Sequence, residues 1–471
     1  MTAHQPAIGR RRLLAATAGL TATALLAPAA SASASAATTP TPTPPIPPAT
    51  AAKGEQAQAL RALERAAHPL RSTEPDGSTA DLRPLDAMIG NAKVVGLGEA
   101  THGSHEFFAM KQRVFSHFVE ERGFTTFCLE MSWTAGLRID EYLQGGAGDA
   151  RRIAQETLTG SPWEREEFVG LIAWMRRHND RNPRRKVHFM GNDVGAPKLG
   201  DAVFDRVLSY VRTSHPQSVA RLERLYEGLR PLDDVFAYLR KPVAERRLNA
   251  ATARQAFDLV AAHKRAGSDA YEWAEQHARN IAQTFEFASL DLSDPASVSA
   301  AEHLRDRVMA DNTAWWHRRT GDKMLLSAHN GHVGYLATDP VMYPTTQGAF
   351  LREALGRDYA AIGFTFGRGS FLTSTTLGSP WNEVTVPAAT PDMQEYTLDR
   401  VRHRDYYLDL RALPAAGRTW LSIPRPTYEA GSSFKKDPLP SLAITRAYDI
   451  LIHLNRIHAA TNIAPFPGGA G

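Results

Sequence analysis

Residues 93–129, KVVGLGEATHGSHEFFAMKQRVFSHFVEERGFTTFCL, decide the fold because they contain the pattern of a strand, a helix and a second strand. The apolar runs 93–98 and 124–129 are short, bounded by glycine, asparagine or polar residues, and typical of buried strands. Between them, residues 105–122 carry apolar side chains at roughly helical spacing. Because the strand residues are apolar on both faces, the pattern predicts a buried parallel sheet.

The same strand signal recurs further along the chain, at 186–190, 323–328, 359–366, 419–423 and 448–454. We expect the last of these strands to finish the sheet. Residues 201–319 carry only helical spacing, so they predict an all-helical insertion, either a cap bordering the active-site cleft or a plain structural bundle. The chain is therefore predicted to be an α/β protein with a mostly parallel central sheet flanked by helices and this large insertion.

Residues 1–36 have the features of an export signal peptide. Three arginines at 10–12 precede an apolar run at about 13–27, and Ala34-Ser35-Ala36 offers a small-residue cleavage site. The consecutive arginines indicate the twin-arginine route, with general secretion as the alternative. The apolar run is short for a membrane span and is followed by Pro28, so no membrane anchor is expected after signal removal. We expect a secreted or extracytoplasmic protein.

A linker of threonine, proline and alanine follows at residues 37–51, so the catalytic domain is expected at 52–471. An apolar share of 43% with 22% charged residues is that of an ordinary folded protein. Of the formal net charge of +4, three charges belong to the leader arginines. No basic stripe interleaved with aromatics is visible, which argues against a nucleic-acid partner. The single cysteine, Cys128, excludes an intramolecular disulfide and a cysteine-based metal site.

Titratable residues follow four strands of the predicted sheet at the points where the strands end. These residues are Glu99 and His102, then Glu130, then Asp193, and finally His329 and His332. Ligands bind where parallel strands end, so we expect these side chains to converge at one edge of the sheet. Each alone has an ordinary structural explanation, such as a turn, a cap or a buried histidine. Together they are typical of a functional site, because crowded titratable groups are costly unless paired.

The chemistry that suits these side chains is hydrolysis. No Gly-x-Ser-x-Gly motif occurs in the chain, which argues against the serine nucleophile of ordinary α/β-hydrolases. A histidine held by a carboxylate can instead take a proton from water, while a cation or second histidine stabilises the oxyanion. Two alternatives stay open: the same side chains could bind zinc or manganese, or the protein could be an exported small-molecule-binding protein without catalysis.

The stretches 95–103, 106–108, 123–130, 305–312 and 328–333 together resemble the erythromycin esterase family in order and spacing. This resemblance covers roughly residues 90–340, with weaker similarity up to the strand near 448. It implies an α/β fold with a helical portion beside a deep cleft, and hydrolysis of a macrolide lactone ester in the best-known members. By the same resemblance, His102 is the general base and Glu99 orients it. Glu130, His329 and His332 complete the cleft around the ester and its oxyanion.

Members that act on macrolides commonly place an arginine in the helix after the first motif, where this chain has Lys111 with Arg113 one step further round. A lysine keeps the charge but loses the planar two-point geometry of an arginine. With Glu106 and Asp193, these two residues form the expected substrate-binding set. We expect an exported hydrolase that cleaves a carboxylic ester or macrolide-like lactone with a histidine-activated water. It is expected to need no cofactor, and its partner is the small-molecule substrate.

Overall fold

The structure, a computed structural model, describes residues 49–264, 267–374 and 380–463. The predicted export signal and nearly all of the predicted linker lie outside these residues. Helix α1, Ala49–Ala66, opens the described part. Among the described residues, no helix combines the length and the apolar character that a membrane span requires.

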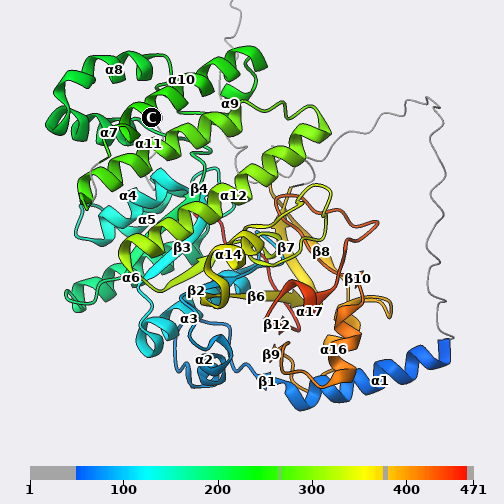
Figure 1. Cartoon of the computed structure of the whole chain (residues 1–471). Coiled ribbons are helices and arrows are strands. Elements are labelled where there is room, and N and C mark those ends of the chain that lie inside the picture. The colour runs from blue at the N-terminus through cyan, green and yellow to red at the C-terminus, as the bar shows by residue number, and fades with distance from the viewer. Residues whose placement is uncertain (1–48, 265–266, 375–379, 464–471) are drawn as a thin grey trace, which may run out of the picture.

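A mostly parallel sheet forms the centre of the described structure, as predicted (Figure 1). Its eight strands lie in the order β1-β9-β12-β6-β2-β5-β3-β4 within the described residues. Neighbours from β12 to β4 pair in parallel, whereas β9 runs antiparallel to both β12 and β1. The strands are β1 (His68–Pro69), β2 (Val94–Leu97), β3 (Thr126–Ser132), β4 (His188–Asp193), β5 (Met324–Ser327), β6 (Tyr359–Phe366), β9 (Tyr406–Asp409) and β12 (Ile450–Leu454).

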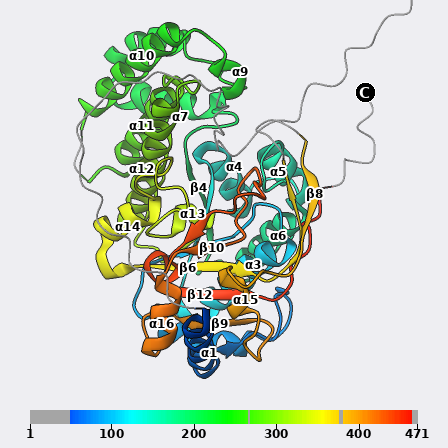
Figure 2. The same ribbon diagram turned by 90° about the vertical axis from the view of Figure 1, so that its right-hand side faces the viewer.

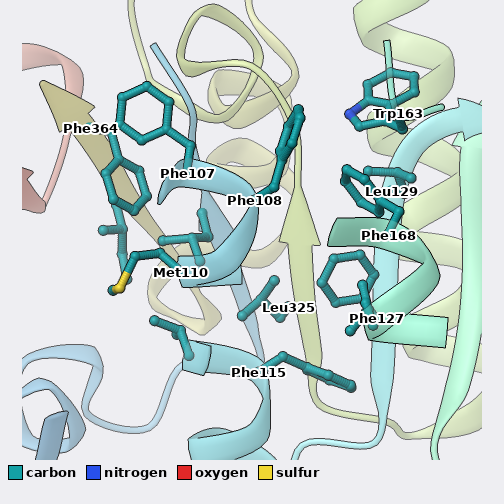
Figure 3. Close-up of a cluster of buried hydrophobic side chains, with 14 of the residues drawn as sticks. Phe107, Phe108, Met110, Phe115, Phe127, Leu129, Trp163, Phe168, Leu325 and Phe364 are labelled. Atoms are coloured by element: carbon teal, nitrogen blue, oxygen red, sulfur yellow. The ribbon is translucent and has the colours of Figure 1, made fainter. Parts of the chain in front are cut away.

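Alternate side chains of the central strands enter two apolar cores, one on each face of the sheet, because successive residues of a strand point to opposite sides. Val95 and Leu325 enter the first core, while their neighbours Val94 and Leu326 enter the second. Helices α3 (His105–Arg122) and α6 (Glu166–Arg181) cover the first core (Figure 3). The second core is covered by α1, α12 (Pro295–Thr320), α14 (Gln347–Leu355) and α16 (Ala415–Ser422).

Helix α3 has the bounds that the sequence predicts. It ends at Gly123, whose φ of 67° lies in the left-handed region that glycine adopts at little cost. Phe107, Phe108 and Phe115 point from this helix into the first core, as Figure 3 shows. The helix is therefore pressed against the sheet and directly follows the loop of Glu99 and His102.

Residues 201–320 are helical, with no strand among the described residues of this segment. This segment has a separate apolar core, which includes Phe204, Leu208, Ile281 and Phe285. Helix α12 leads back from this bundle onto the sheet (Figures 1 and 2). The helices are α7 (Asp201–Ser214), α8 (Val219–Glu227), α9 (Val235–Leu239), α10 (Val243–Ala261), α11 (Asp269–Ala288) and α12.

Two expectations about the later strands are wrong. Residues 419–423 do not form a strand, because most of them belong to helix α16. A short apolar run fits a strand or a buried helix equally well, and Leu421 is buried in the second core on the helix. Strand β12 is the last in the chain but lies inside the sheet, between β6 and β9. The hairpin of β7 (Gly369–Thr373) and β8 (Asn382–Val386) was not predicted.

Candidate active site

A cavity of about 410 Å³ lies beside the loops that leave β2 and β5 and the end of β3. Its wall includes the ionisable side chains of His102, Glu130, Arg305, His329 and His332. Segments 337–343 and 429–440 complete the lining, and they contribute Met342, Tyr343, Pro438, Leu439 and Pro440 among others. The cavity therefore combines ionisable and apolar surface, as expected of a small-molecule site.

Glu99 is the centre of a buried chain of three groups. Its Oε1 lies 2.5 Å from Nδ1 of His102, and its Oε2 accepts a hydrogen bond from Nζ of Lys111. Glu99 and Lys111 are fully buried. Burial lowers the pKa of Lys111, and the contact with Glu99 opposes that shift. Because Glu99 holds Nδ1 of His102, Nε2 is the ring nitrogen that remains for water or substrate.

His329 lies beside His102, with 5.0 Å between the ring centroids. Its Nδ1 accepts the backbone N–H of Gly331 at 3.2 Å, so the neutral ring carries its hydrogen on Nε2. Burial, together with the neighbouring His102 and His332, holds the pKa of His329 well below its usual range. Its Nε2 is buried and has no hydrogen-bond partner among the residues that the structure describes. The site thus places an unused neutral donor next to His102.

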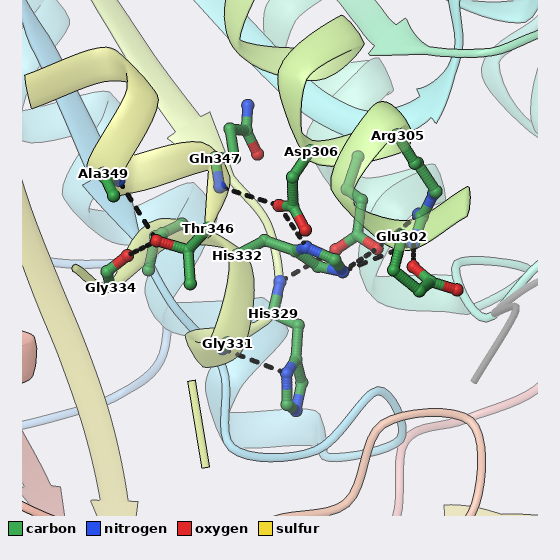
Figure 4. Close-up of polar contacts among 12 residues, drawn as sticks. Glu302, Arg305, Asp306, His329, Gly331, His332, Gly334, Thr346, Gln347 and Ala349 are labelled. Atoms are coloured by element: carbon green, nitrogen blue, oxygen red, sulfur yellow. Dashed lines mark hydrogen bonds and ion pairs between the residues drawn. The ribbon is translucent and has the colours of Figure 1, made fainter. Parts of the chain in front are cut away.

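His332 is held between two carboxylates, and Figure 4 shows its contact with one of them, Asp306. Its Nδ1 lies 2.8 Å from Oδ1 of Asp306, and its Nε2 lies 3.3 Å from Oε1 of Glu130. Burial opposes protonation, but Glu130 and Asp306 outweigh it and raise the pKa of His332 well above its usual range. His332 is therefore an imidazolium at neutral pH, and its positive charge lies in the wall of the cavity.

Arg305 supplies a second buried cation. Its Nη2 donates to Oε1 of Glu130 at 2.8 Å and to Oδ2 of Asp193 at 2.6 Å. Burial raises the pKa of Asp193, and Arg305 opposes this shift. Glu302 lies 3.7 Å from Nη1 of Arg305, and burial raises its pKa to about 8. Glu302 therefore carries a proton at neutral pH, which limits the negative charge around Arg305.

The five residues predicted as catalytic lie together. His102, Glu130, His329 and His332 line one cavity, and Glu99 supports His102 from behind. Glu130 also joins the end of β3 to the loop after β5, because its Oε2 accepts the backbone N–H of His329 at 2.9 Å. Burial by itself would raise the pKa of Glu130. The neighbouring His332 and Arg305 outweigh burial and hold that pKa well below its usual range.

Lys111 and Asp193, predicted to bind substrate, are engaged with other side chains of the site. Lys111 contacts Glu99 rather than the main cavity. Asp193 binds Arg305 and lines a smaller cavity of about 40 Å³, which shares Glu130 and Arg305 with the larger one. Trp163 lines this smaller cavity and meets His102 edge-on, with 5.6 Å between the ring centroids.

Glu106 and Arg113, also predicted to bind substrate, lie outside both cavities. Glu106 accepts the backbone N–H of His458 at 2.7 Å, and Arg113 binds Asp81 at 2.6 Å. Arg113 lies outside the cavities because of the geometry of helix α3. Successive side chains of a helix are rotated by about 100°, so Arg113, two residues after Lys111, points roughly 200° away from the side that faces Glu99.

Five further residues of the site were not predicted from the sequence: Glu302, Arg305, Asp306, Tyr343 and Glu429. Glu302, Arg305 and Asp306 are spaced i, i+3 and i+4 on α12, a spacing that places them on one face and could have identified them. Glu429 lies in a segment without regular structure, and no periodic pattern marks it.

The nitrogen and oxygen atoms of the site are mostly engaged with one another. Within the described residues, no group of three or more His, Cys, Asp or Glu side chains is placed to hold a metal ion. Both nitrogens of His332 face carboxylates, and Nδ1 of His102 is bound to Glu99. A metal ligand must offer a free lone pair, so these residues do not fit a tightly bound metal in this arrangement.

Comparison with known proteins gives concordant results. A family model described as erythromycin esterase matches residues 119–457, which is more than half of the chain. The match includes Glu130, His329 and His332 but begins after Glu99 and His102. Erythromycin esterase type II of Escherichia coli is 24% identical over 331 residues, which cover 63% of this chain and 74% of that protein.

Solved structures share the fold. A crystal structure of a succinoglycan biosynthesis protein has a TM-score of 0.76 and 29% identity, and the match covers 86% of this chain and 98% of that one. An erythromycin esterase mutant in its open conformation has a TM-score of 0.64 and 18% identity, covering 83% of this chain and 98% of that one. At that identity the second likeness concerns the fold alone.

Proposed function

Because the chain belongs to the erythromycin esterase family, we propose that it hydrolyses a carboxylic ester or lactone with a water molecule activated by His102. One observation carries this proposal. His102 is held by Glu99 at 2.5 Å and lies in a cavity wall beside His329, whose Nε2 has no partner among the described residues. A fixed base beside an unused donor is an arrangement that suits hydrolysis without a covalent intermediate.

In the proposed reaction, Nε2 of His102 takes a proton from water while the water oxygen bonds to the carbonyl carbon. Glu99 stabilises the imidazolium that forms, and Lys111 holds the other oxygen of the Glu99 carboxylate. The carbonyl oxygen gains negative charge and accepts the Nε2–H of His329. The positive charges of His332 and Arg305 further stabilise that oxyanion, because electrostatic interactions are strong in a buried site.

The apolar lining favours a bulky substrate such as a macrolide-like lactone. Met342, Tyr343 and Leu439 can contact a carbon skeleton while the ester group lies at the histidines. We propose no cofactor, since the site's own charges supply the stabilisation that a metal would bring. A metal-dependent hydrolase is the second candidate. It would require a metal ion to replace the contacts of His332 with Asp306 and Glu130.

A panel assay tests the function. The purified protein is incubated with macrolides, simple lactones and alkyl esters, and the added mass of one water is sought by mass spectrometry. We expect turnover that resists chelator and falls about 10²–10⁴-fold in His102→Ala, the usual contribution of a general base. His117→Ala is the matched control, since His117 is a buried histidine on α3 that binds Asp86 outside the cavity.

Two other outcomes would contradict this function. Near-stoichiometric metal in the purified protein, with turnover abolished by chelator, would indicate a metal-dependent hydrolase. Tight binding of a ligand that is recovered unchanged, with the same affinity in His102→Ala, would indicate a binding protein without catalysis.

We also propose that the protein acts outside the cytoplasm, on the basis of its leader sequence. Fractionation of producing cells should place the mature chain outside the cytoplasmic membrane. Replacement of the three arginines at 10–12 by lysine should retain it inside if the twin-arginine route is used. A cytoplasmic location of the unaltered protein would contradict the proposal.

A further inference from the structure

Glu429 lies in the wall of the cavity, and the mechanism above gives it no role. Its side chain is only 9% exposed. Its Oε1 accepts a hydrogen bond from Oγ1 of Thr338 at 3.1 Å and lies 3.8 Å from Nδ1 of His329. Its Oε2 has no hydrogen bond to any residue that the structure describes. One carboxyl oxygen is thus held by the protein, and the other is available to a substrate.

The backbone around Glu429 is fixed to the loop that carries His102. Ala430 donates its N–H to the carbonyl of Ala100 at 2.7 Å, and its carbonyl accepts the N–H of His102 at 3.2 Å. On the other side, Oε1 of Glu395 accepts the N–H of Tyr428 at 3.2 Å. The position of the Glu429 carboxyl is therefore set relative to His102 and does not depend on a free loop.

We propose that Glu429 is the general acid that protonates the leaving alcohol when the ester bond breaks, a role that rests on the function proposed above. The water oxygen bonds to the carbonyl carbon, and its proton passes to Nε2 of His102. The bond between that carbon and the alcohol oxygen then breaks, and the carboxyl of Glu429 gives its proton to the leaving oxygen. The proton on His102 finally passes through water to the carboxylate of Glu429, which restores both groups.

The charges around Glu429 suit this role. A general acid must carry a proton at the working pH. Burial raises the pKa of Glu429 to about 7, while Thr338 and the charge of His332 oppose the shift. Among the described residues, the titratable groups that contact Glu429 or interact with its charge are His329 and His332, from the loop after β5, and Tyr448, which follows helix α17 (Ile444–Ala447). Asp339 and Lys435 line the same cavity. Near neutral pH, a substantial fraction of Glu429 is therefore protonated.

Glu429→Gln tests the proposal. Glutamine keeps the shape of the side chain and can accept the hydrogen bond from the Thr338 hydroxyl, but it cannot act as an acid. Hydrolysis is compared for an alkyl ester and a p-nitrophenyl ester of the same acid. An alkoxide leaves poorly without a proton, whereas p-nitrophenolate leaves well without one. We expect the variant to lose about 10²–10⁴-fold in kcat on the alkyl ester. Its rate on the p-nitrophenyl ester should stay within about threefold of the wild type.

A matched control separates catalysis from positioning. Glu395→Gln alters a buried carboxyl that holds the same segment but does not line the cavity. Any loss in that variant should be equal for the two esters. In the wild type, the alkyl-ester rate should fall as the pH rises through about 7, and Glu429→Gln should lack this decline.

Equal losses on both esters in Glu429→Gln, or no loss on either, would overturn the role of Glu429 while leaving the proposed function intact. If the wild type hydrolyses none of the esters, lactones and macrolides tested, the proposed function is overturned, and the role of Glu429 with it.

Discussion

Replacing Lys111 by methionine tests how the catalytic histidine is kept ready to accept a proton. Methionine has a similar volume but no charge, so the packing of α3 is largely kept. In the wild type, Lys111 and His102 bind different oxygens of the same Glu99 carboxylate. Without the ammonium group, Glu99 has His102 as its remaining ionic partner. The buried pair then favours a proton on His102, which blocks its action as a base.

The size of the effect follows from Coulomb's law. Two unit charges roughly 6 Å apart, about the separation expected across a carboxylate, interact by ~2.8 kcal/mol at an effective dielectric constant of about 20. This energy corresponds to a factor on the order of 100 in the protonation equilibrium. In Lys111→Met, activity on the rising limb of the pH profile should therefore fall about 100-fold. It should recover as the pH is raised by about two units, because His102 then loses its extra proton.

The assay is kcat/KM as a function of pH for one ester, beside the same profile for Arg113→Met. Arg113 is the matched control because it lies on the same helix as Lys111 and forms a buried ion pair, with Asp81, but lies outside the cavity. Breaking a buried pair costs about 3–5 kcal/mol, so the control should lose stability without a shift of its pH profile. A uniform loss of activity in Lys111→Met at every pH, or an unshifted profile, would refute this reasoning.

Three further predictions concern stability and reactivity. Gly136→Ala should lower the free energy of unfolding by at least ~2 kcal/mol in urea, because its Cβ would lie 2.0 Å from the backbone N of Gly191; Gly228→Ala, with open space at that position, should have little effect. Burial raises the pKa of Glu302 from its usual 4.5 to about 8, so the wild type should lose stability relative to Glu302→Gln as the pH rises through this window; a difference that stays constant from pH ~4.5 to ~9 in denaturation curves would contradict it. Burial also raises the pKa of the Cys128 thiol, so a thiol reagent should modify Cys128 only after unfolding, and rapid labelling of the native protein would disprove its burial.

Much of the site could be predicted because the strands are short apolar runs that end in titratable residues. The strand before Glu99 and the strand before His329 pair with each other as β2 and β5, so their loops necessarily begin side by side. Glu130 follows the same rule on β3. Local sequence patterns are sufficient here, because parallel strands bring their carboxyl ends to one edge of the sheet.

Other residues could not be placed in this way. Arg113 lies two residues after Lys111, on the opposite side of the helix, and only the packing of α3 decides which of them faces Glu99. Glu429 is 330 positions beyond Glu99, in a segment whose course depends on backbone hydrogen bonds to the His102 loop. Such contacts have no signature in the sequence between them.

The sequence by itself determined the strand and helix pattern, the family resemblance and the histidine and glutamate residues at the strand ends, because hydrophobic periodicity and strand length are local properties. Tertiary structure alone decided the order of the strands, the joining of Glu429 to the His102 loop and the charges of His329 and His332. The physical reason is that a side chain's protonation depends on burial and on the neighbours that folding brings near it. Two histidines three residues apart can therefore differ, one neutral and one charged.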